Sequence, residues 1–197
     1  MALVVNTDTY ITLAEANTYI SEHYTSTDPL KVAWEALSNI DKEVYLRNAA
    51  ISIDALALKG QKYEYTQKMQ FPRCYDSFSY KECFQQYSDP DEYVQYGRLY
   101  CELIVPNNIK YAQAEIAIFN CDKKANKRAN LQNQGVQSFS IGDLSENYGS
   151  KRSPYSNESI IKSKKAIELL RSYLGGTYNV VWLFEWNSTI RRKNYKE

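Results

Sequence analysis

The side chains best suited to nucleophilic, acid–base or metal chemistry are few and scattered in this sequence. The single histidine is His23, and Cys74, Cys83, Cys101 and Cys121 are too far apart for the short spacing of a zinc knuckle. The seven glycines form no Gly-rich phosphate loop, and the acidic residues show no paired-carboxylate pattern. We therefore expect no enzymatic activity, no metal and no cofactor.

Composition narrows the class of protein further. The 197 residues suit one domain, and 24 basic residues balance 23 acidic ones, which argues against a protein that coats nucleic acid with its whole surface. The chain has eighteen tyrosines, a residue type that is favoured at protein interfaces. The alternative explanation is an AT-rich genome, which also raises the tyrosine content. No signal peptide and no run of about 18 apolar residues is present, so we expect no membrane contact and reduced thiols in a cytosolic setting.

Two groups of side chains remain as candidates for binding. The first is basic and follows the expected central helix, and its candidate DNA-channel residues are Lys123, Lys124, Lys127 and Arg128, with a solvated helix end as the alternative. The second is the most apolar nine-residue window, 178–186, which follows Gly175-Gly176. An apolar arm beyond a glycine hinge predicts docking on another protein, or else folding back on its own core. Its candidate docking residues are Val180, Val181, Trp182, Leu183, Phe184, Trp186, Arg191 and Arg192.

Helices are the elements that must position these groups. Thr12 and Glu15 form a capping-box pattern for a helix to about residue 23. Asp28-Pro29 begins a second helix to about 37, with Trp34 in the core, and Ser38 begins a third. We expect this third helix to reach about 59 before Gly60. Its predicted inward stripe contains Val44, then Arg47 or Ala50 as a weak step, then Ile51, Asp54 and Leu58, with Ile40 and Ile53 nearby. Asp54 is either an ion-pair partner or, as we favour, the edge of the stripe. The last helix, 156–174, would bury Ile160, the stem of Lys164, Ile167, Leu170 and Leu174.

The expected central helix, 106–130, is apolar on two faces. One stripe contains Ile109, Ala112, Ile116 and Phe119; the other contains Tyr111, Ala114, Ile118 and Cys121. Such a helix lies between two layers, or between its own core and a neighbouring subunit. The second alternative makes Tyr111, Ala114 and Ile118 candidate subunit-interface residues.

Strand patterns are confined to one segment. Residues 136–141 alternate apolar and polar side chains, and Gly142-Asp143 can turn the chain, so we expect a hairpin at 134–148. Val136, Phe139 and Ile141 are further candidate interface residues, because a lone hairpin needs a surface to lie on. Phe71-Pro72 predicts an elbow that inserts Phe71. Residues 74–103 are expected to be an irregular, aromatic-rich insertion with a short helix from Asp89-Pro90 to about 103.

The predicted fold class is therefore mainly α. It is a bundle of about four to five helices with a small β-hairpin and an extended C-terminal arm. The domain would span 1–176 and the arm 177–197.

The order of these motifs resembles a known family. The segments, in sequence order, are YITLAEANTYISEHY, VAWEALS, LRNAAISIDALALKG, MQFPR, VPNNIKYAQAEIA, GVQSFSIGDLSENY and LLRSYLGG. Together they cover roughly residues 1–73 and 104–174, and they resemble the tailed-phage head–tail connector (head-completion adaptor) family, whose members are often labelled DnaT-like single-stranded-DNA-binding proteins. The insertion at 74–103 and the long tail after Gly176 depart from that pattern.

The resemblance implies a structural virion protein. Its subunits would be assembled in the host cytoplasm as a ring, typically of 12 copies, beneath the portal protein. The ring would extend the DNA channel, contact DNA only transiently and non-specifically, and offer a platform for a tail or stopper protein. In related rings a C-terminal arm inserts into the portal, a role that suits Trp182, Phe184 and Trp186. The alternative reading is a single-stranded-DNA-binding protein, as the family label says.

Overall fold

The structure is a computed structural model that describes residues 3–76, 93–96, 99–122, 138–141, 144–147 and 160–175. The helices are α1 (Leu13–His23), α2 (Pro29–Glu35), α3 (Asn39–Asp54), α5 (Asn107–Cys121) and α8 (Lys164–Leu170), followed by the 3-10 turn η2 (Arg171–Tyr173). A small sheet and a separate hairpin complete the described part, so the predicted mainly α fold class is confirmed. No helix of these described ranges is both long enough and apolar enough to cross a membrane.

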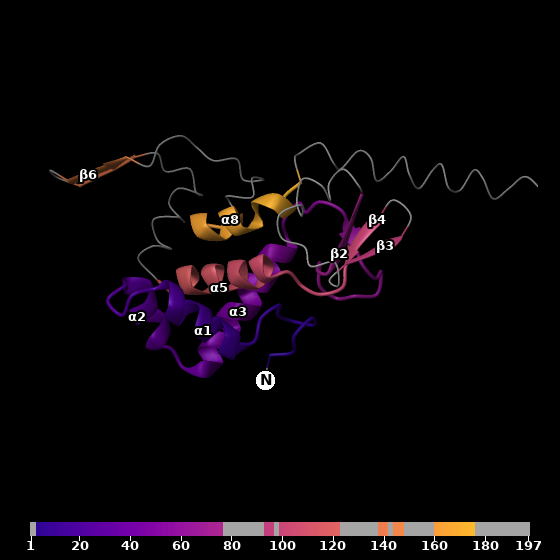
Figure 1. Cartoon of the computed structure of the whole chain (residues 1–197). Coiled ribbons are helices and arrows are strands. Elements are labelled where there is room, and N and C mark those ends of the chain that lie inside the picture. The colour runs from indigo at the N-terminus through magenta and orange to yellow at the C-terminus, as the bar shows by residue number, and fades with distance from the viewer. Residues whose placement is uncertain are drawn as a thin grey trace, which may run out of the picture.

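Helix α5 lies at the centre of the fold. Figure 1 shows it between α8 on one side and α1, α2 and α3 on the other, and it contacts each of these four helices. Both predicted stripes are buried, as shown by Ile109 and Ala112 on one face and Ala114 and Ile118 on the other. The second face is therefore covered by the protein's own second layer, which was the first of the two alternatives. The prediction of a helix that continues to residue 130 is wrong at Asp122, because α5 ends at Cys121 and Asp122 is its C-cap in an extended conformation. Residues 123–130 lie outside the described ranges.

The predicted helix starts are confirmed at three N-caps. The Thr12 hydroxyl accepts from the Glu15 amide at 3.1 Å, while the Glu15 carboxylate accepts from the Thr12 amide at 2.8 Å. Asp28 accepts from the Leu30 amide at 2.8 Å, with Pro29 in the first turn. Ser38 caps α3 by accepting from the Asp41 amide at 3.1 Å. Trp34 of α2 is buried, as expected.

The buried face of α3 differs from the prediction. Leu46, Ala49, Ala50 and Ile53 are buried, whereas Val44 is 46% and Ile51 is 66% exposed. Both faces are apolar, so periodicity alone could not choose between them, and the packing of α5 decides. The helix also ends at Asp54, several residues before Gly60. Asp54 is not the edge of a stripe, because its carboxylate accepts from the Tyr10 hydroxyl and from the Gln70 amide.

The described residues 73–76, 93–96 and 99–102 form strands, where we expected an irregular insertion with a short helix. The strands are β1 (Gln61–Lys62), β2 (Arg73–Asp76), β3 (Tyr93–Tyr96) and β4 (Leu99–Glu102), in the antiparallel order β1-β2-β4-β3. Gly60 enters β1 with a φ of 70°, and a Cβ there would lie 2.1 Å from the Cys74 carbonyl oxygen, so this turn requires glycine. Phe71 is buried before a cis Pro72, which confirms the elbow that inserts it.

A disulfide between Cys74 and Cys101 corrects the expectation of reduced thiols. The two cysteines are register partners on β2 and β4, with their Cα atoms 4.0 Å apart, although 27 positions separate them in sequence. Closing a span of this length contributes about 3 kcal/mol in the chain-entropy account. Cys121 remains a free, buried thiol, and burial raises its pKa to about 11. Cys83 is outside the described ranges.

The predicted hairpin is confirmed. Strand β5 (Ser138–Ile141) pairs antiparallel with β6 (Leu144–Asn147), from Ile141 opposite Leu144 to Ser138 opposite Asn147. Figure 1 shows it apart from the helical layers. A two-stranded hairpin alone is only marginally stable in water, so this hairpin is a candidate for contact with another surface.

Candidate functional site

The structure places only part of the predicted site residues. The candidate arm residues Val180–Trp186, Arg191 and Arg192, the candidate channel residues Lys123, Lys124, Lys127 and Arg128, and Val136 all lie outside the described ranges. Phe139 and Ile141 belong to β5.

The candidate interface residues of α5 are not on a free surface. Ala114 and Ile118 are fully buried in the protein's own core. Tyr111 is partly exposed and packs against that core, with its ring stacked on Tyr19 at a centroid distance of 4.7 Å. In this conformation Ala114 and Ile118 pack the chain against itself, which corrects their assignment to a subunit contact.

Two tyrosines from α1 converge on a buried carboxylate of α5. The hydroxyls of Tyr19 and Tyr24 donate to Glu115 at 2.9 and 2.5 Å. Burial, together with the adjacent carboxylate, raises the pKa of both tyrosines far above the usual value. These bonds satisfy the buried Glu115 and fix the end of α1 on α5.

An exposed ring lies outside this buried cluster. His23, in the last turn of α1, stacks on Tyr19 with a centroid distance of 4.1 Å, and its Nδ1 lies 2.8 Å from the Tyr19 carbonyl oxygen. The outer face of the imidazole is exposed to solvent. An exposed flat ring with a fixed orientation is a surface on which a base can stack.

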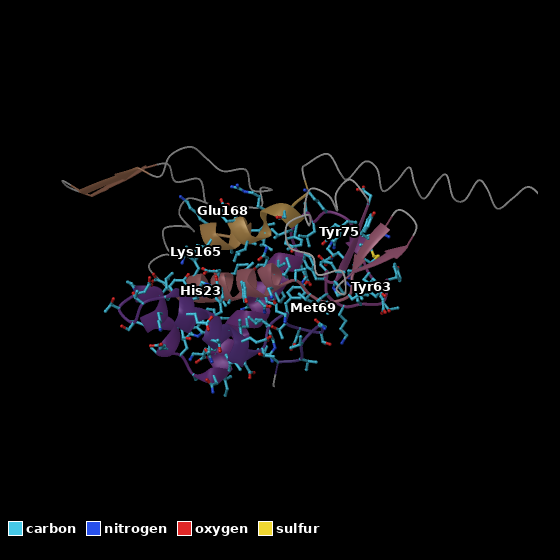
Figure 2. All side chains as sticks on the ribbon, viewed as in Figure 1. His23, Tyr63, Met69, Tyr75, Lys165 and Glu168 are labelled. Atoms are coloured by element: carbon cyan, nitrogen blue, oxygen red, sulfur yellow. A yellow bond between two sulfur atoms is a disulfide. The ribbon has the colours of Figure 1, made fainter. Side chains whose placement is uncertain are left out.

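Three lysines occur close together in sequence where α8 begins, at the same end of the helices as His23. Lys162, Lys164 and Lys165 occur within four positions around the N-cap of α8, and Lys164 and Lys165 are exposed. The Lys165 Nζ lies 4.1 Å from the centre of the Tyr24 ring, a cation–π contact that holds α8 against α1. Partial burial lowers the pKa of Lys162. Figure 2 shows His23 and Lys165 at the same end of the helices. We call the group of Lys162, Lys164, Lys165, His23 and Tyr24 the lysine–tyrosine end.

The sequence prediction missed the lysine–tyrosine end. It gave Lys164 a buried stem inside a helix from 156, whereas α8 begins at Lys164 and leaves this side chain exposed. The available signal was the run Lys162-Ser163-Lys164-Lys165. Figure 1 shows α5 and α8 running in opposite directions, so α5 ends where α8 begins. The C-terminal end of α5 therefore lies at this same end of the bundle.

Other polar clusters have structural roles. The Arg73 guanidinium is bound by the carbonyl oxygens of Lys59 and Gly60, each at 2.7 Å, and by the Gln70 side chain at 2.8 Å. A hollow of about 370 Å³ between α1, α2 and α3 has Trp34 in its wall, whose indole donates to Asn17 at 2.9 Å. Within the described ranges no group of three or more His, Cys, Asp or Glu side chains is arranged to hold a metal ion.

Comparison with known proteins gives one match. A family model described as "Putative DnaT-like ssDNA binding protein" matches residues 1–184. No curated protein and no solved structure matches this chain. Because the match covers nearly the whole sequence, the chain belongs to this family of DnaT-like ssDNA-binding proteins.

Proposed function

We propose that this protein binds single-stranded DNA through the lysine–tyrosine end, and that it acts by binding and not by catalysis. The observation that carries the proposal is that the exposed His23 lies at the same end of the helices as Lys165, whose neighbour in sequence is the exposed Lys164. Membership of the DnaT-like family supports it.

The chemistry of the lysine–tyrosine end suits a strand with unpaired bases. Lysine ammonium groups attract phosphates without reading the sequence, and an aromatic face stacks any base. The overall charge of +1 limits such attraction to a local patch, so the expected binding is weak, independent of sequence and sensitive to salt. The basic residues 123–128 would extend the patch, since they follow directly from the end of α5.

Reversing two charges of the patch tests the proposal. The double variant Lys164→Glu/Lys165→Glu should lower the affinity for a fluorescein-labelled oligo-dT at least about tenfold at low salt, because two phosphate contacts become repulsive. The slope of log affinity against log salt should also fall by about one unit. Fluorescence anisotropy titrations over a range of salt concentrations measure both quantities.

A matched control separates a local site from general charge. Lys68→Glu/Arg171→Glu changes the net charge equally at two exposed positions away from the lysine–tyrosine end, and it should lower affinity far less. An equal loss in both variants, or no binding of oligo-dT by the native protein at any salt concentration, would contradict the proposal.

A second function is favoured by the hairpin. Strands β5 and β6 pair only with each other among the described strands, and such a unit needs a further surface for stability. The resemblance of the ordered motifs to head–tail connectors supplies one: a ring, typically of 12 copies, beneath a portal protein in the virion, with a tail or stopper protein below it.

The connector function predicts a change of particle size. On mixing with the portal protein of its own phage, the chain should form a ring-shaped particle, visible by electron microscopy and by light scattering. A variant without residues 177–197 should lose this attachment if the arm inserts into the portal. If the protein stays monomeric in the presence of the portal protein but binds oligo-dT, the connector function would be contradicted and only single-stranded-DNA binding would stand.

A further inference from the structure

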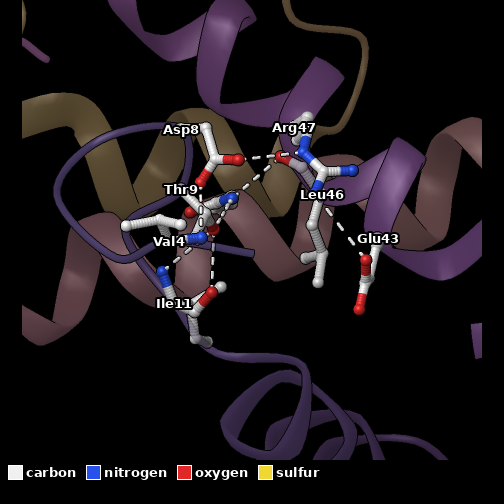
Figure 3. Close-up of polar contacts among 8 residues, drawn as sticks. Val4, Asp8, Thr9, Ile11, Glu43, Leu46 and Arg47 are labelled. Atoms are coloured by element: carbon white, nitrogen blue, oxygen red, sulfur yellow. Dashed lines mark hydrogen bonds and ion pairs between the residues drawn. The ribbon is translucent and has the colours of Figure 1, made fainter. Parts of the chain in front are cut away.

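Helix α3 has a second apolar face, which is turned away from the core. Ile40 is 73% exposed, and it shares one helical stripe with the exposed Val44 and Ile51. Arg47 lies within the stripe, and its guanidinium is drawn aside by Asp8 at 3.0 Å and by Glu43 at 3.7 Å, as Figure 3 shows. The stem of Arg47 can therefore extend the apolar surface between Val44 and Ile51.

The described chain ends beside this stripe. The Gly175 amide donates to the Ala57 carbonyl oxygen at 2.8 Å, and Leu174 forms a bridge with Leu58, just beyond the C-terminal end of α3. Ala55, the C-cap of α3, is exposed and continues the stripe toward this point. The next residues of the chain therefore start at the C-terminal end of the apolar face.

The length of the following segment matches the length of the stripe. Val180 is five residues beyond Gly175, so an extended chain can carry it about 17 Å, well past the last turn of α3. From Ile51 to Ile40 the helix rises about 16 Å, and the seven residues 180–186 span about 23 Å when extended. The apolar window can therefore cover the whole stripe of its own helix.

The distribution of charge also favours one direction for the segment along α3. Residues 191–193 are Arg-Arg-Lys, and they follow the apolar window by a few positions. At the N-terminal end of α3 the exposed Asp41 lies near Glu43 in sequence, while Lys42 is directed to the Trp34 ring. A segment that runs from the C-terminal to the N-terminal end of α3 brings its basic residues toward the exposed Asp41 carboxylate.

We propose that residues 180–186 lie along the outer face of α3 of the same chain, antiparallel to the helix, with Trp182 against Ile51 and Phe184 against Val44. The contact uses the end of α8 opposite to the lysine–tyrosine end, so it is independent of DNA binding. It gives the arm a resting position from which a partner protein would have to displace it.

Hydrogen exchange in the full-length protein tests this placement. Peptides covering residues 178–188 should exchange at least about tenfold more slowly than a synthetic peptide of the same sequence. The double variant Val44→Asp/Ile51→Asp should remove this protection, because carboxylates replace the apolar contacts. The control Val32→Asp, at an exposed apolar position on α2, should retain it. Exchange at the free-peptide rate in the native chain, or protection that survives Val44→Asp/Ile51→Asp, would overturn the proposal.

A cross-linking measurement tests the same contact in case the substitutions Val44→Asp and Ile51→Asp disturb the fold. Mild oxidation of Val44→Cys/Phe184→Cys should give an intramolecular disulfide in monomeric protein, whereas Val32→Cys/Phe184→Cys should give none. Protection or cross-linking that appears only at high protein concentration, between two chains, would assign the face to a second copy and refute the same-chain contact.

Discussion

Replacing Glu102 with glutamine should stabilise the protein above pH 8 and leave its stability almost unchanged at pH 5. Glu102 is buried at the end of β4, where it accepts from the Arg73 amide at 3.0 Å and from the Tyr75 hydroxyl at 3.1 Å. Burial raises the pKa of this carboxyl to about 8, although these hydrogen bonds and the Arg73 charge oppose the shift.

The sign of the pH dependence follows from proton binding. In the unfolded chain Glu102 releases its proton near pH 4.5, whereas in the folded chain it keeps the proton until about pH 8. The folded state therefore binds more protons between these values, and the free energy of unfolding falls as pH rises through this window. Each unit of pKa difference corresponds to about 1.4 kcal/mol, so the total loss is several kcal/mol.

Denaturant unfolding of the native protein and of Glu102→Gln at pH 5, 7 and 9 measures this contribution. The difference between the two free energies should grow with pH, since the amide has no proton to lose. Glu22→Gln, an exposed position on α1, provides the control and should show a difference near zero throughout. A difference that is constant from pH 5 to 9 would show that Glu102 does not titrate in this range.

Replacing Gln113 with leucine should lower the free energy of unfolding by about 3–5 kcal/mol, because three buried groups lose their partner at about 1–3 kcal/mol each. The Gln113 side chain, fully buried on α5, donates to the Thr9 hydroxyl and to the Leu46 carbonyl oxygen, both at 2.8 Å. Its oxygen accepts from the Tyr10 amide, also at 2.8 Å. One amide thus joins the N-terminal segment, α3 and α5.

The effect should appear both in stability and in local exchange. Urea unfolding gives the free energy, and hydrogen exchange of the Tyr10 amide should accelerate more than that of the α1 amides. Asn48→Leu, which changes an exposed amide on α3, should cost less than about 0.5 kcal/mol. A cost for Gln113→Leu as small as that of the control would mean that water replaces the lost hydrogen bonds.

Features encoded by neighbouring residues were predictable from the sequence. The caps at Thr12, Asp28 and Ser38 depend on bonds to residues two or three positions away, and the hairpin depends on alternation around one turn. The exposed face of α3 was not predictable, because the exposed Val44 and the buried Leu46 belong to equally apolar faces and only the packing of α5 distinguishes them.

Contacts between segments that are far apart in the sequence could also not be predicted from it. Cys74 and Cys101 meet because β2 and β4 are adjacent and in register, a fact that their spacing does not contain. The lysine–tyrosine end could not be predicted for the same reason, since Tyr24 and Lys165 come from opposite ends of the chain. The arm and the basic run after Cys121 remain predictions.

The burial of both alanine-bearing faces of α5 has a practical consequence for spectroscopy. A dye or spin label attached at Ala112, Ala114 or Ala117 would have to displace the neighbouring helices, so it would report on denaturation and not on complex formation. Labels that report on partners belong on the outer turns of α3 or at the start of α8, where a bulky probe meets solvent.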